Sequence, residues 1–415
     1  MSGLPPFLSL PDAVLAAVQS SLARRENARR SVLAHDPRQL AEFRQRGAQA
    51  ALDAFTAQTA TLEANSGKNR YSDIVPYDRT RVTLPDRPSP SEDYINASWI
   101  SDPSAPRMWI ASQAPLPETN HDFLSLFLQD RAAASSPPPK VILMLTACNE
   151  SGRQKSARYW PERVGASIKI HHQVPNSSSS PQKHQYAPHQ WQNGPLPPIR
   201  VTYLSSSHSS TQDEKEARGW RTNRLSLASG SSGQSVEIDH IEYLGWQDHG
   251  VPSSPSELLR LLAHLDSFTR PEEPVMVHCS AGVGRTGTCI AIAWLIPVMQ
   301  RLLDADETAL DALRKSAELS SLGPLPVTPH QDKPRGFLPS LFNHSPAREP
   351  EDSDLIDFDP VMAIIDHLRD QRTTMVQTSS QVEYVYTCCR LWWKGARQRA
   401  GDIRREPGKK RNRIE

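Results

Sequence analysis

A glycine-rich stretch, HCSAGVGRTG at positions 278–287, constrains the fold of this chain more than any other feature of its sequence. It follows a short apolar run (274–277) typical of a buried strand and precedes an apolar run (288–302) typical of a helix. A strand that passes through glycines into a helix directs the backbone N–H groups of the turn toward one spot. The stretch therefore predicts an α/β fold with an anion-binding loop.

The last six residues of the stretch, GVGRTG, also match the G-x-G-x-x-G pattern of dinucleotide-binding loops. That kind of loop needs a second strand that ends in an acidic residue about 20 residues further on. Asp304 and Asp306 lie near that distance, but they follow the helix directly in RLLDADET, without a strand between. The sequence therefore disfavours a dinucleotide, and we expect no cofactor.

The cysteine and the arginine of the stretch favour another kind of loop. Five residues separate Cys279 from Arg285, so the loop amides, the helix N-terminus and the guanidinium all face one position. That position suits a tetrahedral dianion, with Arg285 binding two of its oxygens. The same field favours the nucleophilic thiolate of Cys279, and the Thr286 hydroxyl is placed to donate a hydrogen bond to the sulfur. We expect a nucleophilic cysteine in a phosphate-binding loop.

Composition narrows the class of protein. The chain has 415 residues, 37% of them apolar, which is enough for a sizeable core, and its formal net charge of +1 gives no field that attracts nucleic acid. Its five cysteines include no C-x-x-C pair, which favours a reducing compartment and gives no metal-site pattern. The N-terminus lacks the basic region of a signal peptide, and the longest apolar run (289–299) is too short to span a membrane. We expect a soluble intracellular protein without a metal.

Strand-like and helix-like segments alternate along the chain. Strands are predicted at 140–147, 166–172, 198–205, 236–246 and 274–279, and apolar helical periodicity is found at 258–268 and 382–393. Asn120 is expected to cap the helix that follows it. Polar stretches rich in Ser, Pro and Gly (131–139, 173–198, 205–213, 228–235) predict loops, and 318–356 is predicted to be disordered. The alternation predicts an α/β domain with long polar insertions.

The stretch HCSAGVGRTG resembles the signature of the protein tyrosine phosphatases. A C-x5-R motif alone also fits dual-specificity, low-molecular-weight and rhodanese-like enzymes, so other motifs must separate these families. The resemblance covers about residues 65–395 and implies one large catalytic domain, with a twisted mixed sheet flanked by helices. Residues 1–64 are then expected to form a helical segment that packs on this domain, and residues 396–415 a basic tail.

Within the signature, the resemblance implies that Cys279 is the nucleophile and that Arg285 and the loop amides bind the phosphate. Thr286 is expected to assist at the sulfur and His278 to support the loop. The residues whose backbone is expected to bind phosphate are Ser280, Ala281, Gly282, Val283 and Gly284.

Two further motifs resemble the mobile acid loop and the phosphotyrosine-recognition loop of the family. In WQDHGVP (246–252), Asp248 stands at the position of the general acid and Trp246 at the hinge. In KNRYSDIVPYDRTRV (68–82), Tyr71 is expected to wall a deep slot and Asp73 to accept hydrogen bonds from the substrate backbone. This second motif implies specificity for phosphotyrosine. Gln247 departs from the family, which usually has proline there.

Three other segments resemble supporting parts of the family's site. DYINASWI (93–100) and QAP (113–115) match its core, with Asn96 bracing the recognition loop. In NESGRQKSARYWP (149–161), Glu150 is expected to pair with the signature arginine and Lys155 to contact the acid loop. In VQTSSQVEYVY (376–386), Gln377 is expected to position the hydrolytic water, with Gln381 supporting it.

Together these resemblances imply a metal-free, non-receptor tyrosine phosphatase that acts on phosphotyrosine-containing proteins in cytoplasmic signalling through a phosphocysteine intermediate. The basic tail, with its PGKKRNR stretch, favours a nuclear location as well. Two alternatives stay open. One is a weakly active or inactive phosphotyrosine-binding module, which the departure from the family pattern at Gln247 makes plausible. The other is a dual-specificity or lipid phosphatase, which the Tyr71 motif opposes.

Overall fold

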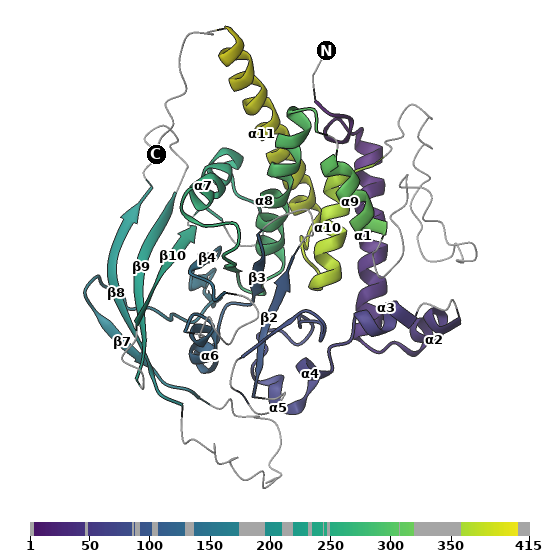
Figure 1. The fold of residues 1–415 in the computed structure, drawn as a ribbon. Coiled ribbons are helices and arrows are strands. Elements are labelled where there is room, and N and C mark those ends of the chain that lie inside the picture. Colours follow the sequence, from purple (N-terminus) through teal and green to yellow (C-terminus); the bar gives the residue numbers. More distant parts are fainter. Residues whose placement is uncertain are drawn as a thin grey trace.

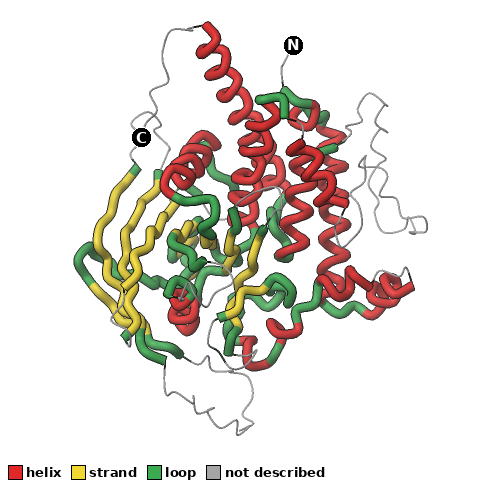
Figure 2. Tube along the Cα trace, viewed as in Figure 1, coloured by secondary structure: helices red, strands yellow, loops and turns green. Residues whose placement is uncertain are grey.

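Nine strands form one mixed sheet with helices on both faces (Figures 1 and 2). The computed structural model describes residues 4–45, 49–84, 87, 92–101, 107–128, 137–173, 196–209, 219–230, 235–243, 245–246, 250–306, 308–318 and 358–405. Within them the strand order is β1-β2-β3-β11-β4-β10-β9-β8-β7. The strands of the sheet are β1 (Arg81–Thr83), β2 (Tyr94–Ile100), β3 (Trp109–Ser112), β4 (Val141–Met144), β7 (Ser167–Ile170), β8 (Ile199–His208), β9 (Trp220–Ser229), β10 (Ser235–Tyr243) and β11 (Val275–His278).

The helices differ widely in length, and a two-stranded ribbon of β5 (Asn149–Glu150) and β6 (Arg153–Gln154) stands apart from the sheet. The described helices are η1 (Pro6–Leu8), α1 (Asp12–Leu33), α2 (Pro37–Gln45), α3 (Gln49–Ala54), α4 (Gln58–Thr61), α5 (Glu63–Ser66), η2 (Pro117–Thr119), α6 (Asn120–Ser125), α7 (Pro255–Phe268), α8 (Gly284–Leu303), α9 (Thr308–Glu318), α10 (Pro360–Gln371) and α11 (Ser379–Arg405).

The central strand β11 carries the signature loop at its carboxyl end. It pairs in parallel with β3 on one side and with β4 on the other, so both of its edges are hydrogen-bonded. Its side chains alternate, with Val275 and Val277 in the larger core under the long helices and Met276 in the core on the opposite face. A strand buried on both faces reads as a continuous apolar run, which is the pattern in the sequence.

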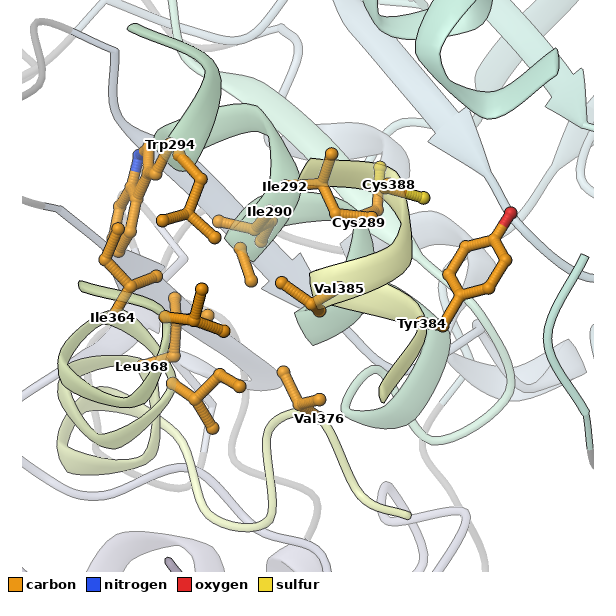
Figure 3. Packing of buried hydrophobic residues seen from close by; sticks show 14 of the residues in the cluster. Cys289, Ile290, Ile292, Trp294, Ile364, Leu368, Val376, Tyr384, Val385 and Cys388 are labelled. Carbon is orange, nitrogen blue, oxygen red and sulfur yellow. The ribbon is translucent and has the colours of Figure 1, made fainter. Parts of the chain in front are cut away.

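The helices α8, α10 and α11 cover one face of the sheet. Helix α10 packs on α8 and α1, and α11 packs on α8 and α7. Figure 3 shows side chains of the three helices meeting in one apolar cluster, and its labelled members include Ile290, Ile292, Ile364, Leu368, Val376 and Val385. By length and composition alone α8 could cross a membrane, but most of it is buried in this core, as expected for the core helix of a globular domain.

The N-terminal segment shares the same core. Helix α1 lies along α10, which brings the first helix of the chain beside one that begins near residue 360 (Figure 1). Its apolar side chains Val14, Val18 and Leu22 belong to the main cluster. Helix α1 is therefore joined to the sheet and to α10 through a common core.

The single α/β domain with a mixed sheet flanked by helices is confirmed, and the predicted strands are present with shifted ends. The loop predicted from 205 is wrong at its start, because residues up to His208 continue β8 and pair with β9. A ladder of backbone hydrogen bonds holds these serine-rich positions extended despite their composition. Most of 173–198 and all of 319–357 lie outside the described residues.

Two helix ends also differ from the prediction. Asn120 does not cap α6, because it is the first residue of that helix and its side-chain nitrogen donates to the carbonyl of Arg158 instead (3.4 Å). The first ten residues of the predicted basic tail, 396–405, are helical, because α11 continues to Arg405. The rest of the tail, 406–415, lies outside the described residues.

Candidate active site

The end of β11 presents Cys279 to the turn that starts α8. The cysteine is buried, with 5% of its surface exposed, and its Sγ accepts a hydrogen bond from the backbone N–H of Gly282 (3.3 Å). An N–H that donates to sulfur stabilises the anionic form of the thiol more than the neutral form. The local fold thus creates a site at which the sulfur of Cys279 is hydrogen-bonded by its own loop.

The backbone carbonyls of the loop all turn away from this site. Those of Cys279, Ser280, Ala281, Gly282 and Val283 accept hydrogen bonds from, in turn, His278, Ala114, Arg372, Arg372 and Val376. In a trans peptide the carbonyl and the following N–H point in opposite directions. The N–H groups of residues 280–284 therefore point away from these partners, toward the side of the loop on which the N–H of Gly282 donates to Cys279 Sγ. This is the arrangement that a phosphoryl dianion requires.

Glycine at position 282 is required by the packing of this loop. Its φ of +73° lies in the left-handed region, and a Cβ there would come within 2.1 Å of the carbonyl oxygen of Ser112. Any larger residue would push the loop away from β3.

The signature arginine is held in a fixed orientation by a carboxylate. Arg285 donates to both oxygens of Glu150, at 2.7 and 2.8 Å, and also to the carbonyl of Leu145 at 3.0 Å. Partial burial raises the pKa of Glu150, but its hydrogen bonds and charge interaction with Arg285, together with the Thr146 hydroxyl and the Ala147 amide, bring it below its usual value. Glu150 is therefore ionised, and the planar pair orients the guanidinium toward the loop.

Arg372 is a functional residue that the sequence did not suggest. It is fully buried, and it donates to Gly282 O (2.9 Å), Ala281 O (3.1 Å), Asn96 Oδ1 (2.7 Å) and Ser98 Oγ (3.2 Å). All four acceptors are uncharged. Burial lowers the pKa of Arg372 to about 10, so it remains a cation at neutral pH. Its charge acts on Cys279 from behind the loop and favours an anion there.

His278 belongs to a buried series of hydrogen bonds that no pattern in the sequence indicates. Its Nδ1 lies 3.1 Å from Cys279 O, its Nε2 lies 2.8 Å from the Tyr159 hydroxyl, and that hydroxyl lies 3.0 Å from His240 Nε2. Burial lowers the pKa of both histidines to about 3, so both are neutral.

Only one arrangement of protons satisfies this series of hydrogen bonds. Cys279 O can only accept, so His278 Nδ1 donates to it and His278 Nε2 accepts from Tyr159. The Tyr159 oxygen then accepts from His240 Nε2, and His240 Nδ1 accepts from Asn223 Nδ2, 3.3 Å away. This series of hydrogen bonds holds the backbone carbonyl of Cys279 in place. Its far end, Asn223, lies on β9, three strands from β11 in the sheet.

The recognition-loop motif lies against the signature loop. The Tyr71 hydroxyl is 2.9 Å from Ser280 Oγ, and Ser280 Oγ also donates to the carbonyl of Lys155 (3.2 Å). Tyr71 is 37% exposed, so solvent reaches this residue beside the loop. Asp73 is exposed and pairs with Arg30 of α1 (3.4 Å).

Asn96 ties this motif to the sheet. Its Nδ2 donates to the carbonyl of Ile74 (2.8 Å) and to the side-chain oxygen of Asn69 (2.9 Å), while its Oδ1 accepts from Arg372. One buried amide thus joins the recognition loop, β2 and the arginine that holds the signature loop.

The glutamine motif reaches the loop from the other side. A Cβ built on Gly284 would lie 3.3 Å from Gln377 Oε1 and 3.0 Å from Gln381 Nε2, so both side chains border the loop. Gln381 Oε1 in turn accepts from the backbone N–H of Gln377 (2.9 Å).

For three predicted features of the site, the described residues do not show the expected contact. Asp248 and Gln247 lie outside the described residues, but the hinge before them is described, and Trp246 Nε1 donates to Gly250 O (2.9 Å). The contact of Lys155 with the acid loop therefore remains a prediction, because residues 247–249 of that loop lie outside the described residues. The Thr286 hydroxyl is buried and has no hydrogen-bond partner among the described residues, so the expected bond to Cys279 Sγ is not formed in this state.

The fold and the site define an α/β protein that presents a cysteine and an arginine in one glycine-rich loop between β11 and α8. The chain belongs to the protein-tyrosine phosphatase family, because the family model "Protein-tyrosine phosphatase" matches residues 65–189 and 175–316. This confirms the resemblance drawn from the sequence motifs.

Curated relatives include both receptor-type and non-receptor enzymes. Human receptor-type tyrosine-protein phosphatase H is 34% identical over 245 residues, covering 58% of this chain and 18% of the relative. Mouse tyrosine-protein phosphatase non-receptor type 4 is 34% identical over 243 residues, covering 57% and 21%. Human receptor-type tyrosine-protein phosphatase C is 33% identical over 240 residues, covering 57% and 15%. The chain thus spans about a fifth or less of the length of these relatives.

Proposed function

We propose that this protein hydrolyses phosphotyrosine in other proteins through a phosphocysteine intermediate. The observation that carries the proposal is the contact of Tyr71 with Ser280, which places a tyrosine ring beside the loop that holds Cys279. A phosphoryl group bound by the loop amides would leave its aryl ring against Tyr71. Phosphoserine is too short for its phosphoryl group to reach the loop at the bottom of a slot lined by Tyr71, so this slot favours phosphotyrosine.

In the first step, the Cys279 thiolate attacks phosphorus and the phosphorus–oxygen bond to the tyrosine breaks. The N–H groups of residues 280–284 and the guanidinium of Arg285 stabilise the equatorial oxygens. Asp248 gives its proton to the departing tyrosyl oxygen, so that free tyrosine and phosphocysteine are formed.

In the second step, Asp248 accepts a proton from a water that attacks the phosphocysteine. Gln377, which borders Gly284, positions this water. The phosphorus–sulfur bond breaks, which releases inorganic phosphate and regenerates the thiolate. Arg285 and the loop amides supply the charge stabilisation that metal ions supply in other phosphatases.

We further propose that the reaction takes place in the cytoplasm as part of phosphotyrosine signalling, with a nuclear fraction directed by the basic tail. All five cysteines are free thiols, which suits a reducing compartment and a chemistry that depends on a reduced Cys279. The non-receptor assignment belongs to this proposal.

The test is turnover of a phosphotyrosyl peptide in the presence of a chelator, with Cys279→Ser as the matched variant. A serine hydroxyl stays protonated at neutral pH, so residual activity should be below about one per cent of wild type. The same assay with phosphoserine peptides and phosphoinositides covers the other classes. Comparable rates on these substrates would indicate a dual-specificity or lipid phosphatase. Binding of phosphotyrosine without turnover would indicate a binding module.

A further inference from the structure

The connection between α10 and α11 adopts an unfavourable backbone conformation directly before Gln377. Thr374 has a φ of 61° and Val376 a φ of 54°, so two β-branched residues out of three occupy the left-handed region. Such residues seldom adopt this conformation, and it persists only where the surroundings enforce it. The contacts that enforce it therefore decide where the following residue lies.

One set of these contacts comes from Glu26 of helix α1. Its carboxylate is buried, with 6% of the residue exposed, and Oε1 accepts from the backbone N–H of Thr374 at 2.7 Å. The same oxygen accepts from the hydroxyls of Thr373 (3.0 Å) and Thr374 (3.2 Å). A charged acceptor with three donors from two adjacent residues holds that peptide strongly.

A second set comes from Arg369 of α10. This guanidinium donates to the carbonyls of Met375 and Val376, both at 2.8 Å, and to the carbonyl of Leu22 in α1 at 2.9 Å. Helix α1 thus binds the connection both directly and through Arg369.

The connection transmits its position to the signature loop. The Val376 N–H donates to Val283 O (3.2 Å), and a Cβ on Gly287 would lie 2.5 Å from the nitrogen of Val376. The two backbones are therefore in close contact, and Figure 3 shows Val376 at the edge of the cluster that also contains α8 residues. Movement of 374–376 would displace both the loop and Gln377.

We propose that Glu26 is a positioning residue for catalysis. By holding Thr373 and Thr374, it keeps the strained connection in the conformation that places Gln377 at the loop for hydrolysis of the phosphocysteine. This inference rests on the proposed function of the site and assigns a part in it to the N-terminal helix, outside the residues 65–316 that match the family model.

The test compares Glu26→Ala with Gln19→Ala. Gln19 is also on α1, and its side chain donates to Glu383 (3.0 Å), which lies in α11 and not in the connection. We expect Glu26→Ala to lower both kcat and KM for p-nitrophenyl phosphate about tenfold, with kcat/KM changed by less than about twofold, because the loss falls on the second step, after p-nitrophenol has left. Gln19→Ala should leave both constants unchanged. Stopped-flow traces should show a burst of p-nitrophenol in Glu26→Ala as phosphocysteine accumulates.

Recovery of kcat by a second substitution to glycine distinguishes a positioning role of Glu26 from a general loss of stability. Glycine adopts a φ near 61° without strain, so Thr374→Gly in the Glu26→Ala background should recover most of kcat. Glu26→Gln keeps an acceptor oxygen and serves if the alanine variant does not fold, with an expected fall in kcat of about threefold. A folded Glu26 variant with wild-type kcat, or a folded double variant without recovery, would overturn the proposal.

Hydrogen exchange gives a readout that does not depend on turnover. In Glu26→Ala the backbone amides of 373–378 should exchange at least about tenfold faster, whereas those of β11 should keep their wild-type rates. Unchanged exchange at 373–378 would overturn the role of Glu26. Absence of phosphotyrosine turnover in the wild-type protein would instead overturn the proposed function, and the exchange result would still report whether Glu26 holds the connection.

Discussion

Arg372 donates from Nε to the carbonyl oxygen of Gly282 across 2.9 Å, although 90 residues separate the two in the chain. The contact turns that carbonyl outward and so turns the N–H of Val283 inward. The arginine is a buried cation whose four hydrogen-bond acceptors are uncharged, and it lies behind a loop that is built for an anion. It therefore shapes the loop and contributes to its positive potential.

Arg372→Lys tests this relationship. A single ammonium cannot reach Gly282, Ala281 and Asn96 together, so the loop amides should lose their common direction. We expect kcat/KM for p-nitrophenyl phosphate to fall about 10- to 100-fold, in line with the loss of oxyanion stabilisation in other enzymes. Arg390→Lys is the matched control, because Arg390 also donates to a backbone carbonyl (2.8 Å), but that carbonyl belongs to Leu8 in η1 and not to the loop. Unchanged kcat/KM in a folded Arg372→Lys protein would show that the loop keeps its shape unaided.

Asp73→Ala should discriminate between peptide and small-molecule substrates. A carboxylate that accepts from substrate backbone amides affects only substrates that have a backbone. We expect KM for a phosphotyrosyl peptide to rise about tenfold and KM for p-nitrophenyl phosphate to stay within about twofold. Arg30→Ala removes the exposed ion pair with Asp73 but keeps the carboxylate, and such pairs contribute little to stability. An equal rise in peptide KM in both variants would assign the effect to the pair.

The two buried histidines predict that stability falls in mild acid. The pKa of His240 and His278 is about 3 in the folded protein because of burial, against 6.5 as the ordinary value. Below pH 6.5 the unfolded chain binds protons that the folded chain does not, so the free energy of unfolding decreases as pH falls. Between pH 7 and 5.5 the loss should be about 1 kcal/mol for each histidine, measurable by urea unfolding.

Asp359 opposes this trend. Burial raises the pKa of Asp359 to about 6, although hydrogen bonds from Tyr386 and the amides of Val361 and Met362 lower it. The folded protein therefore takes up a proton near pH 6 that the unfolded chain does not, and this adds stability as pH falls. Asp359→Asn removes that gain, so its loss of stability between pH 7 and 5.5 should exceed that of wild type by less than about 1 kcal/mol. A wild-type stability that is flat over this range would contradict the assignment of two neutral histidines.

Gln247→Pro should raise kcat on a phosphotyrosyl peptide. Proline restricts φ to near −65° and limits the residue before it, so a segment that carries it samples fewer conformers. The hydrogen bond from Trp246 to Gly250 O already joins the two ends of the acid-loop motif. If the open form dominates, a gain of one to two kcal/mol for the closed form corresponds to roughly five- to thirty-fold in its population. Vanadate affinity should change little, and a lower kcat would show that the rest of the loop has adapted to glutamine.

The signature loop could be predicted because its chemistry is contiguous in the sequence. Cys279, the glycines and Arg285 stand within one stretch, and the apolar runs on either side identify the strand and the helix that hold it. The pairing of Glu150 with Arg285 was implied by the family resemblance, and the structure brings the two together.

The supporting residues could not be predicted in this way. Arg372, Tyr159 and Glu26 act by contacting backbone atoms or neighbouring side chains that are distant in sequence, and no local pattern marks a polar residue as buried. Arg372 stands in LRDQRTTM, which reads as a polar helix end. Only tertiary packing reveals that it faces the loop. The strained φ values of Thr374 and Val376 left no trace in residue type, because glycine is absent from both positions.

The order of the strands places the signature loop far from two long connections of the sheet, so the length of those connections can change independently of the loop. Four strands lie between β11 and the edge strand β7, and the stretches 174–195 and 210–218 connect β7 to β8 and β8 to β9. A residue gained or lost there leaves the register of β11 with β3 and β4 untouched. Evolution can therefore use this margin of the sheet to acquire docking or modification sequences, and a protein engineer can insert a tag or a sensor there without altering the reaction.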